Sequence, residues 1–104
     1  MFLNLGRLID SGDLMKIYKL TQDVNSGYDT YDGIIVIAKD ENQAILMYPS
    51  YENIMSEEYD FSDNEWPGHS YSWANKQSDV KIELLGSAGK NSKARIVLAS
   101  FNAG

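Results

Sequence analysis

The sequence contains no cysteine among its 104 residues. This absence excludes disulfide bonds, thiolate nucleophiles and cysteine zinc sites, and it is compatible with a reducing cytoplasm, where we expect the protein to work. No apolar run approaches the roughly 18–20 residues that a membrane-spanning helix needs. The opening MFLNLGRLIDSGDL is too polar for a secretory signal, and its two aspartates argue against a transit peptide.

Histidine and basic residues are also scarce. One histidine is present, and nine Lys and Arg face fifteen Asp and Glu, so the formal net charge is −6. Affinity for nucleic-acid phosphates comes from Lys and Arg, which makes direct nucleic-acid binding an unfavoured function. An acidic chain is better suited to a basic protein surface, although charge of this size also serves solubility alone.

The remaining composition is that of a packed globule, with 43% hydrophobic and 12% aromatic residues. This length and composition predict one domain over residues 15–104. Residues 1–14 form a separate arm or short helix in this interpretation, because Gly6 and Gly12 interrupt their helical spacing of apolar residues.

Four segments have the composition or alternation of strands, and the second is apolar on both faces, which is typical of a central strand. They are residues 15–20, 30–38, 80–84 and 94–101. Asp40, with Gln43 three residues on, predicts a helix of two to three turns that Pro49 ends. The fold class is therefore α+β, an antiparallel or mixed sheet in ββαββ order with one helix on a face. Residues 49–75 are predicted to form a long irregular loop.

That loop belongs to the most unusual part of the sequence. Residues 40–75 contain eight acids, seven aromatic residues and no Lys or Arg. Carboxylates steer a basic partner, and Tyr and Trp are common at binding hot spots. The residues predicted to contact a partner are Glu52, Glu57, Glu58, Tyr59, Asp60, Phe61, Asp63, Glu65 and Trp66. The alternative is structural: Trp66 and Trp73 fill the core, and the acids only face solvent.

Catalytic residues are not indicated. A single histidine, His69, does not define a triad, and Asp29 and Asp32 would lie on opposite faces of a strand. Their spacing also departs from that of a calcium-binding loop, so turn capping is favoured over a metal site. The small basic cluster of Lys90, Lys93 and Arg95 is a weak anion site. We expect no enzyme activity, no metal and no cofactor.

The stretch QDVNSGYDTYD at residues 22–32, Trp73 and the ending ASFNAG at residues 99–104 carry a resemblance. They resemble a group of small uncharacterised proteins of bacterial genomes, phages and other mobile elements. The group supplies no activity, but the resemblance implies that the turn and the C-terminal tail form one feature. Its residues would be Asn25, Tyr28, Asp29, Tyr31, Asp32, Phe101 and Asn102.

Two functions remain open from the sequence. The first is a phage-type inhibitor of bacterial immunity, similar in size and acidity to anti-CRISPR proteins, whose acidic surface mimics nucleic acid and blocks a nuclease or its complex. The alternative is a small-ligand or signalling-nucleotide binder that uses the 25–32 turn and the C-terminal tail. Homo-oligomerisation is compatible with either function.

Overall fold

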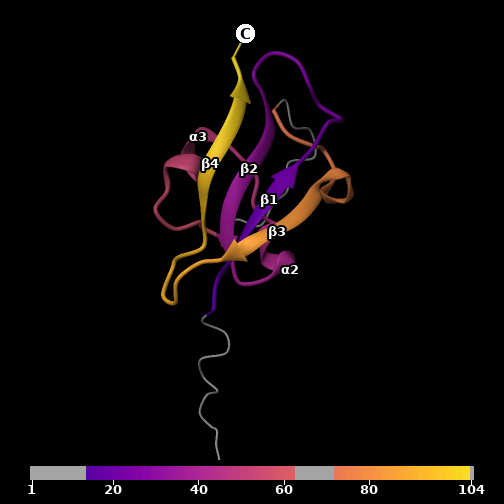
Figure 1. Cartoon of the computed structure of the whole chain (residues 1–104). Coiled ribbons are helices and arrows are strands. Elements are labelled where there is room, and N and C mark those ends of the chain that lie inside the picture. The colour runs from indigo at the N-terminus through magenta and orange to yellow at the C-terminus, as the bar shows by residue number, and fades with distance from the viewer. Residues whose placement is uncertain (1–13, 63–71, 104) are drawn as a thin grey trace, which may run out of the picture.

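A computed structural model of the chain describes residues 14–62 and 72–103. Its centre is one antiparallel sheet with the strand order β3-β1-β2-β4 (Figure 1). The four strands are β1 (Lys16–Thr21), β2 (Thr30–Ala38), β3 (Lys81–Ser87) and β4 (Arg95–Asn102). The α+β class, the four strands and the central position of β2 are confirmed, and the sheet is wholly antiparallel.

Strands β1 and β2 form a hairpin in which Lys16 lies opposite Ala38 and Thr21 opposite Gly33. The connecting turn needs left-handed backbone at Gly27, with φ of 125°, and at Asp29, with φ of 62°. Glycine has no Cβ to clash there, and aspartate tolerates this region better than most residues. The other two strands then take the outer places, so the β3–β4 connection passes below the hairpin (Figure 1).

Residues 14–62 and 72–103 contain two α-helices, α2 and α3, and both are shorter than expected. The single helix predicted from Asp40 to Pro49 is wrong in length, because α2 (Glu41–Ala44) is one turn. Its predicted cap is confirmed, since the Asp40 carboxylate accepts a 2.8 Å hydrogen bond from the Gln43 N–H. A second turn, α3 (Tyr51–Met55), lies inside the segment predicted to be an irregular loop.

Helix α3 begins because the Ser50 hydroxyl accepts a hydrogen bond from the Asn53 N–H at 3.1 Å. Ser50 therefore restarts a helix directly after Pro49 has ended the preceding turn. A further 3-10 turn, η2 (Gln77–Asp79), leads into β3. Helix α2 packs against β2 and α3 against β4; in Figure 1 α3 lies beside β4, and α2 lies just below β3.

The hydrophobic core lies between these helices and one face of the sheet. Trp73 is fully buried there, which confirms the prediction that it is a core residue. The core also contains Tyr18, Leu20, Ile34, Val36, Ala38, Ala44, Met47, Tyr59, Ala74, Val80, Ala94 and Ile96. Burying this set of side chains is the main source of stability in a domain of this size.

Two predictions fall outside the described residues. The arm over residues 1–14 is described only at Leu14. Residues 40–75, which we call the acidic segment, are described except for residues 63–71, which include His69. None of the described helices has the length and apolar character needed to cross a membrane.

Candidate functional site

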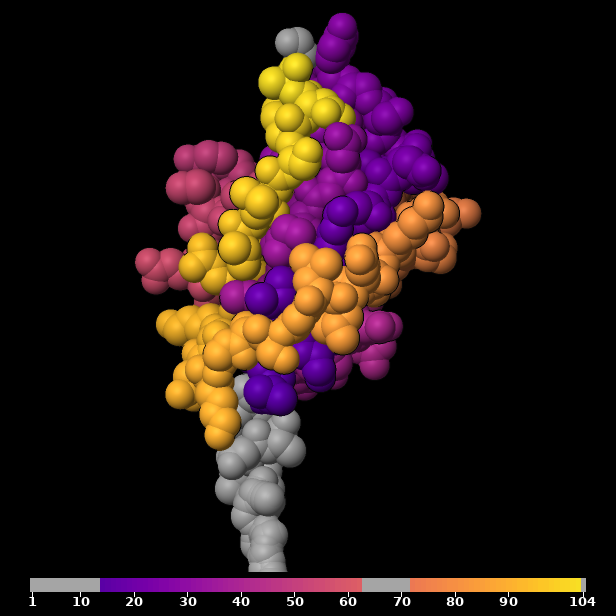
Figure 2. Space-filling view, viewed as in Figure 1, coloured from indigo at the N-terminus to yellow at the C-terminus, as the bar shows by residue number. Residues whose placement is uncertain are grey.

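The face of the sheet opposite the core is not covered by any helix among the described residues. Strand β2 alternates, so Ile34 and Val36 are buried in the core while Ile35 and Ile37 point to the opposite face and are half-buried. Ile35 pairs with Leu98 of β4, whose side chain is 64% exposed. We call this side of the sheet the open face; Figure 2 shows it, with β4 and β3 flanking β1 and β2.

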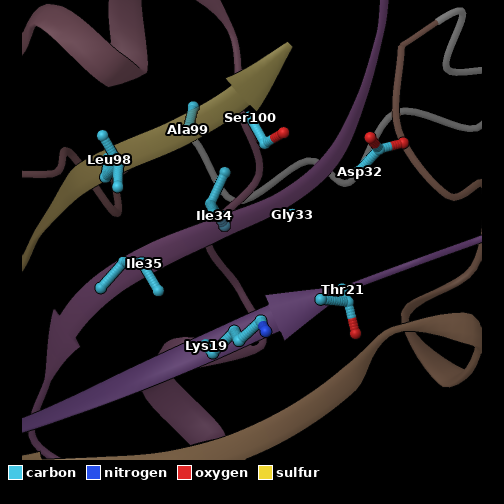
Figure 3. Close-up of a pocket in the computed structure, with 9 residues that line it drawn as sticks. All are labelled: Lys19, Thr21, Asp32, Gly33, Ile34, Ile35, Leu98, Ala99 and Ser100. Carbon is cyan, nitrogen blue, oxygen red and sulfur yellow. The ribbon is translucent and has the colours of Figure 1, made fainter. Parts of the chain in front are cut away.

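A shallow cavity of about 540 Å³ lies on the open face between β1, β2 and β4 (Figure 3). Most of its lining surface is apolar, and Lys19, Thr21, Asp32 and Ser100 add polar groups. Gly33 also lines the cavity, and β1 approaches it closely. A Cβ at Gly33 would lie 3.0 Å from the Leu20 carbonyl oxygen, so a larger residue would not fit there without a shift. The cavity therefore suits an apolar side chain or a flat apolar ligand better than a charged one.

The β4 edge of the open face adds further exposed apolar surface. Val97 of β4, next to Leu98, is 51% exposed. Leu84 of β3 and Phe101 of β4 are also about half exposed, but they pair with Tyr18 and Tyr31, which pack with the core, and so they belong to the core side of the sheet. Single exposed leucines need no explanation, but a contiguous apolar surface on a small domain often marks a protein contact.

The acidic segment lies on the other side of β4. Glu52 on α3, and Glu57, Glu58 and Asp60 in the following loop, are all exposed. The chain reaches β4 here through a 2.7 Å hydrogen bond from the Tyr59 N–H to the Ala94 carbonyl. Hydrogen bonds from the Ser62 hydroxyl and N–H hold the pKa of Asp60 below its usual value, so this carboxylate stays charged.

Two aromatic residues of the predicted partner-binding set pack toward the core of the domain. Tyr59 is 6% exposed and belongs to the core, where its hydroxyl accepts a 3.2 Å hydrogen bond from the Tyr48 N–H. Phe61 is half-buried against the Tyr59 ring, with the centroids 4.7 Å apart. Three further members of that set, Asp63, Glu65 and Trp66, lie outside the described residues.

The 22–32 turn and the C-terminal tail meet, as the resemblance implied. Tyr31 lies opposite Phe101 in the β2–β4 pairing, and their ring centroids are 4.8 Å apart. The Asn102 side-chain amide donates to the Asp32 carboxylate at 2.9 Å. The Asp29 N–H donates to the Asn102 carbonyl at 2.6 Å.

The polar groups of this turn bond mainly to one another. The Gln22 side chain donates to the Asn25 and Tyr31 carbonyls and accepts from the Asn25 N–H, while the Asn25 amide donates to the Trp73 carbonyl at 3.0 Å. Such mutual bonding fixes the turn against the core and satisfies the groups that a ligand would otherwise use. Tyr28, at 81% exposed, points to solvent, and Asp29, Asp32 and Phe101 are exposed as well.

The remaining candidates for chemistry are dispersed. Lys90 and Lys93 are exposed in the β3–β4 connection, and Arg95 lies at the start of β4 opposite Ile37. Among the described residues, no group of three or more His, Cys, Asp or Glu side chains is placed to hold a metal ion.

Comparison with protein-family models, with curated proteins and with solved structures finds no match to this chain.

Sequence reasoning missed the open face. The signal was present in the unbroken run Ile34-Ile35-Val36-Ile37, which predicts apolar contact on both sides of β2. Among the described residues the structure supplies that contact on one side only, and Ile35 and Ile37 on the other side stay half-buried.

Proposed function

We propose that this protein is a non-catalytic binding module that holds another protein on the open face of its sheet. The observation that carries the proposal is the half-buried pair Ile35 and Ile37, next to the exposed Leu98, on a face that no described helix covers. Desolvating such side chains contributes roughly 25 cal/mol per Å² of apolar area, and the cavity beside them accepts an apolar side chain of the partner.

The acidic segment has a separate part in the proposal. Glu52, Glu57, Glu58 and Asp60 lie behind β4 rather than on the open face. Carboxylates at this position attract a basic protein over a distance and raise the association rate, whereas the apolar face governs dissociation. The partner is therefore a protein with an apolar patch beside Lys and Arg.

A nuclease, or a complex that contains one, fits this description because its nucleic-acid channel is basic. In its specific form the proposal is stoichiometric inhibition: the protein blocks a nuclease of bacterial immunity, as a phage-type inhibitor of the anti-CRISPR kind does. The net charge of −6 and the absence of Lys and Arg from residues 40–75 support this form.

The test is retention of a partner from bacterial lysate, followed by binding measurements with that purified partner. The double variant Ile35→Thr with Leu98→Thr places β-branched residues, which favour strands, at both positions and removes the two central apolar side chains, so we expect binding to weaken by tenfold or more. Val24→Thr is the matched control, because Val24 is 57% exposed in the hairpin turn, away from this face. Equal retention of the partner by both variants would refute the proposal.

Charge reversal tests the steering part independently. Lysine at Glu57, Glu58 and Asp60 should lower the association rate and remove its salt dependence, with a smaller change in the dissociation rate. A salt-independent association rate in the wild type would remove electrostatic attraction from the proposal and leave the apolar contact.

A second candidate function is small-ligand binding, which the cavity beside Asp32 and Ser100 favours. Nucleotides added one at a time should raise the melting temperature of the protein if one of them binds the folded state. Asp32→Asn should abolish that rise. No shift with any nucleotide would leave protein binding as the function to pursue.

A further inference from the structure

We propose that two copies of this chain associate through the outer edge of β4, in antiparallel register about Ser100, to form a continuous eight-stranded sheet. The proposal concerns the edge of the sheet and goes beyond the partner that the open face would hold. It rests on the difference between the two edge strands, the direction of the β4 backbone groups and the neutrality of the strand.

The two edges of the sheet differ in how they resist pairing. Edge strands are templates for further strands, and proteins block them with charged residues and bulges. Strand β3 carries the exposed Lys81 and Glu83 and has a register shift that leaves Leu85 without a partner residue. Strand β4 has its own shift at Val97, but beyond it no residue is charged up to its end at Asn102.

The segment 98–102 also presents free backbone groups. The Asn102 carbonyl points toward β2, because it accepts from the Asp29 N–H. In an antiparallel ladder the groups of successive residues alternate in direction, so those of Ser100 also face β2 and those of Ala99 and Phe101 face outward. Among the described residues, β4 has a strand neighbour on its β2 side alone.

This alternation selects a register for self-pairing. A twofold axis at Ser100 places Ala99 opposite Phe101 of the second copy, and each such pair exchanges two backbone hydrogen bonds. The small Ala99 side chain leaves room for the Phe101 ring, which is 47% exposed in one copy. Ser100 then meets itself on the axis as a pair without hydrogen bonds, with Cα atoms about 4.5 Å apart.

The β4 strand itself carries no negative charge that would repel a second copy. The protein has a net charge of −6, and the acidic Glu52 lies on α3, which packs against β4, but the one charged residue of β4 is Arg95. The two strands therefore meet over neutral residues with a positive group at each end. In this register Arg95 of each copy lies just past Asn102 of the other copy, outside the paired residues. Asn102 in turn donates a hydrogen bond to Asp32 of its own copy.

The experiment is sedimentation equilibrium of the full chain over roughly 10 to 500 μM, the range suited to a contact of this small size. The wild type and Ser100→Asn are expected to dimerise alike. Ser100→Asp and Ser100→Lys each place like charges across the axis and should weaken dimerisation by roughly tenfold or more. An equimolar mixture of the Asp and Lys variants should restore it.

The two charged variants also control for effects within one copy. Asp32 lines the same cavity as Ser100, so an aspartate at 100 is repelled by it and a lysine is attracted. Loss of dimers in both variants, with thermal unfolding retained, therefore reports on the contact between copies. A wild type that stays monomeric throughout, equal dimerisation of the Asn and Asp variants, or a mixture that fails to dimerise would each overturn the proposal. Ile35 lies in the central strand, away from the β4 edge, so Ile35→Thr should still dimerise whether or not it retains a partner protein, which separates this result from the proposed function.

Discussion

The two faces of the sheet are built from alternate residues of the same strands, yet they end in different environments. On one face Ile34 and Val36 are buried beneath Trp73 and two single-turn helices. On the other, Ile35 and Ile37 are half-buried by their neighbours in the sheet alone among the described residues. Hydrophobicity in a strand thus predicts that a contact is needed but does not say whether the same chain supplies it.

The largest expected effect comes from removing the cover of the core face. Trp73→Ala should lower the free energy of unfolding by about 3–5 kcal/mol, because the fully buried indole leaves a cavity that short helices fill poorly. Urea unfolding followed by circular dichroism measures this change. A loss below about 1 kcal/mol would mean that the loop around Trp73 collapses to refill the space.

A pair of identical substitutions compares the faces directly. Ile34→Ala should cost about 2–5 kcal/mol, and Ile35→Ala, one residue away on the same strand, about 1 kcal/mol. The two share the same loss of strand propensity, so their difference in urea unfolding isolates burial on the two faces. Equal costs would show that the open face is covered in solution.

The helix caps on the core side should have a smaller effect. Asp40→Ala and Ser50→Ala each remove the hydrogen bond that begins a one-turn helix, and each should cost about 1 kcal/mol. Ser78→Ala, at an exposed position of η2, is the matched control and should change the unfolding free energy by less than about 0.5 kcal/mol. A cap variant as stable as this control would show that packing alone holds the turn.

The smallest expected effect is a pH dependence from Tyr18. Burial, with Glu41 and Asp40 as lesser causes, raises the pKa of its phenol above the usual 10.0. Because the folded-state pKa is the higher one, the contribution to stability is complete below pH 10 and declines as pH rises toward the folded value. The wild type should therefore lose more stability than Tyr18→Phe between about pH 9 and 11, as measured by urea unfolding. Parallel losses would assign the alkaline dependence to other groups.

The strands were predictable because their signals are local. The bounds of β2 match the predicted 30–38, and the cap at Asp40 was read correctly from its spacing to Gln43. Helix α3 was missed since its signal is one short Ser50-x-x-Asn53 cap within an acidic stretch that resembles a loop. The predicted meeting of the turn and the tail came from a resemblance, not from local pattern.

What local sequence could not show is which residues of the acidic segment face inward. Tyr59 was predicted to contact a partner, but the Tyr48 N–H and the Ala94 carbonyl hold it in the core. These contacts span many residues and arise only when β4 is in place. The same holds for the open face, because the order of strands decides which apolar side remains without a cover.

The pairing of β2 with β4 has a consequence for how the chain folds. Its hydrogen bonds join residues as far as 72 positions apart, as between Asn102 and Thr30. The β1–β2 hairpin is synthesised first, whereas β4, which pairs with the free edge of β2, is the last of the four strands to be synthesised. Folding should therefore be slow for a domain of this size, and in the interval the apolar central strand is an open edge exposed to aggregation.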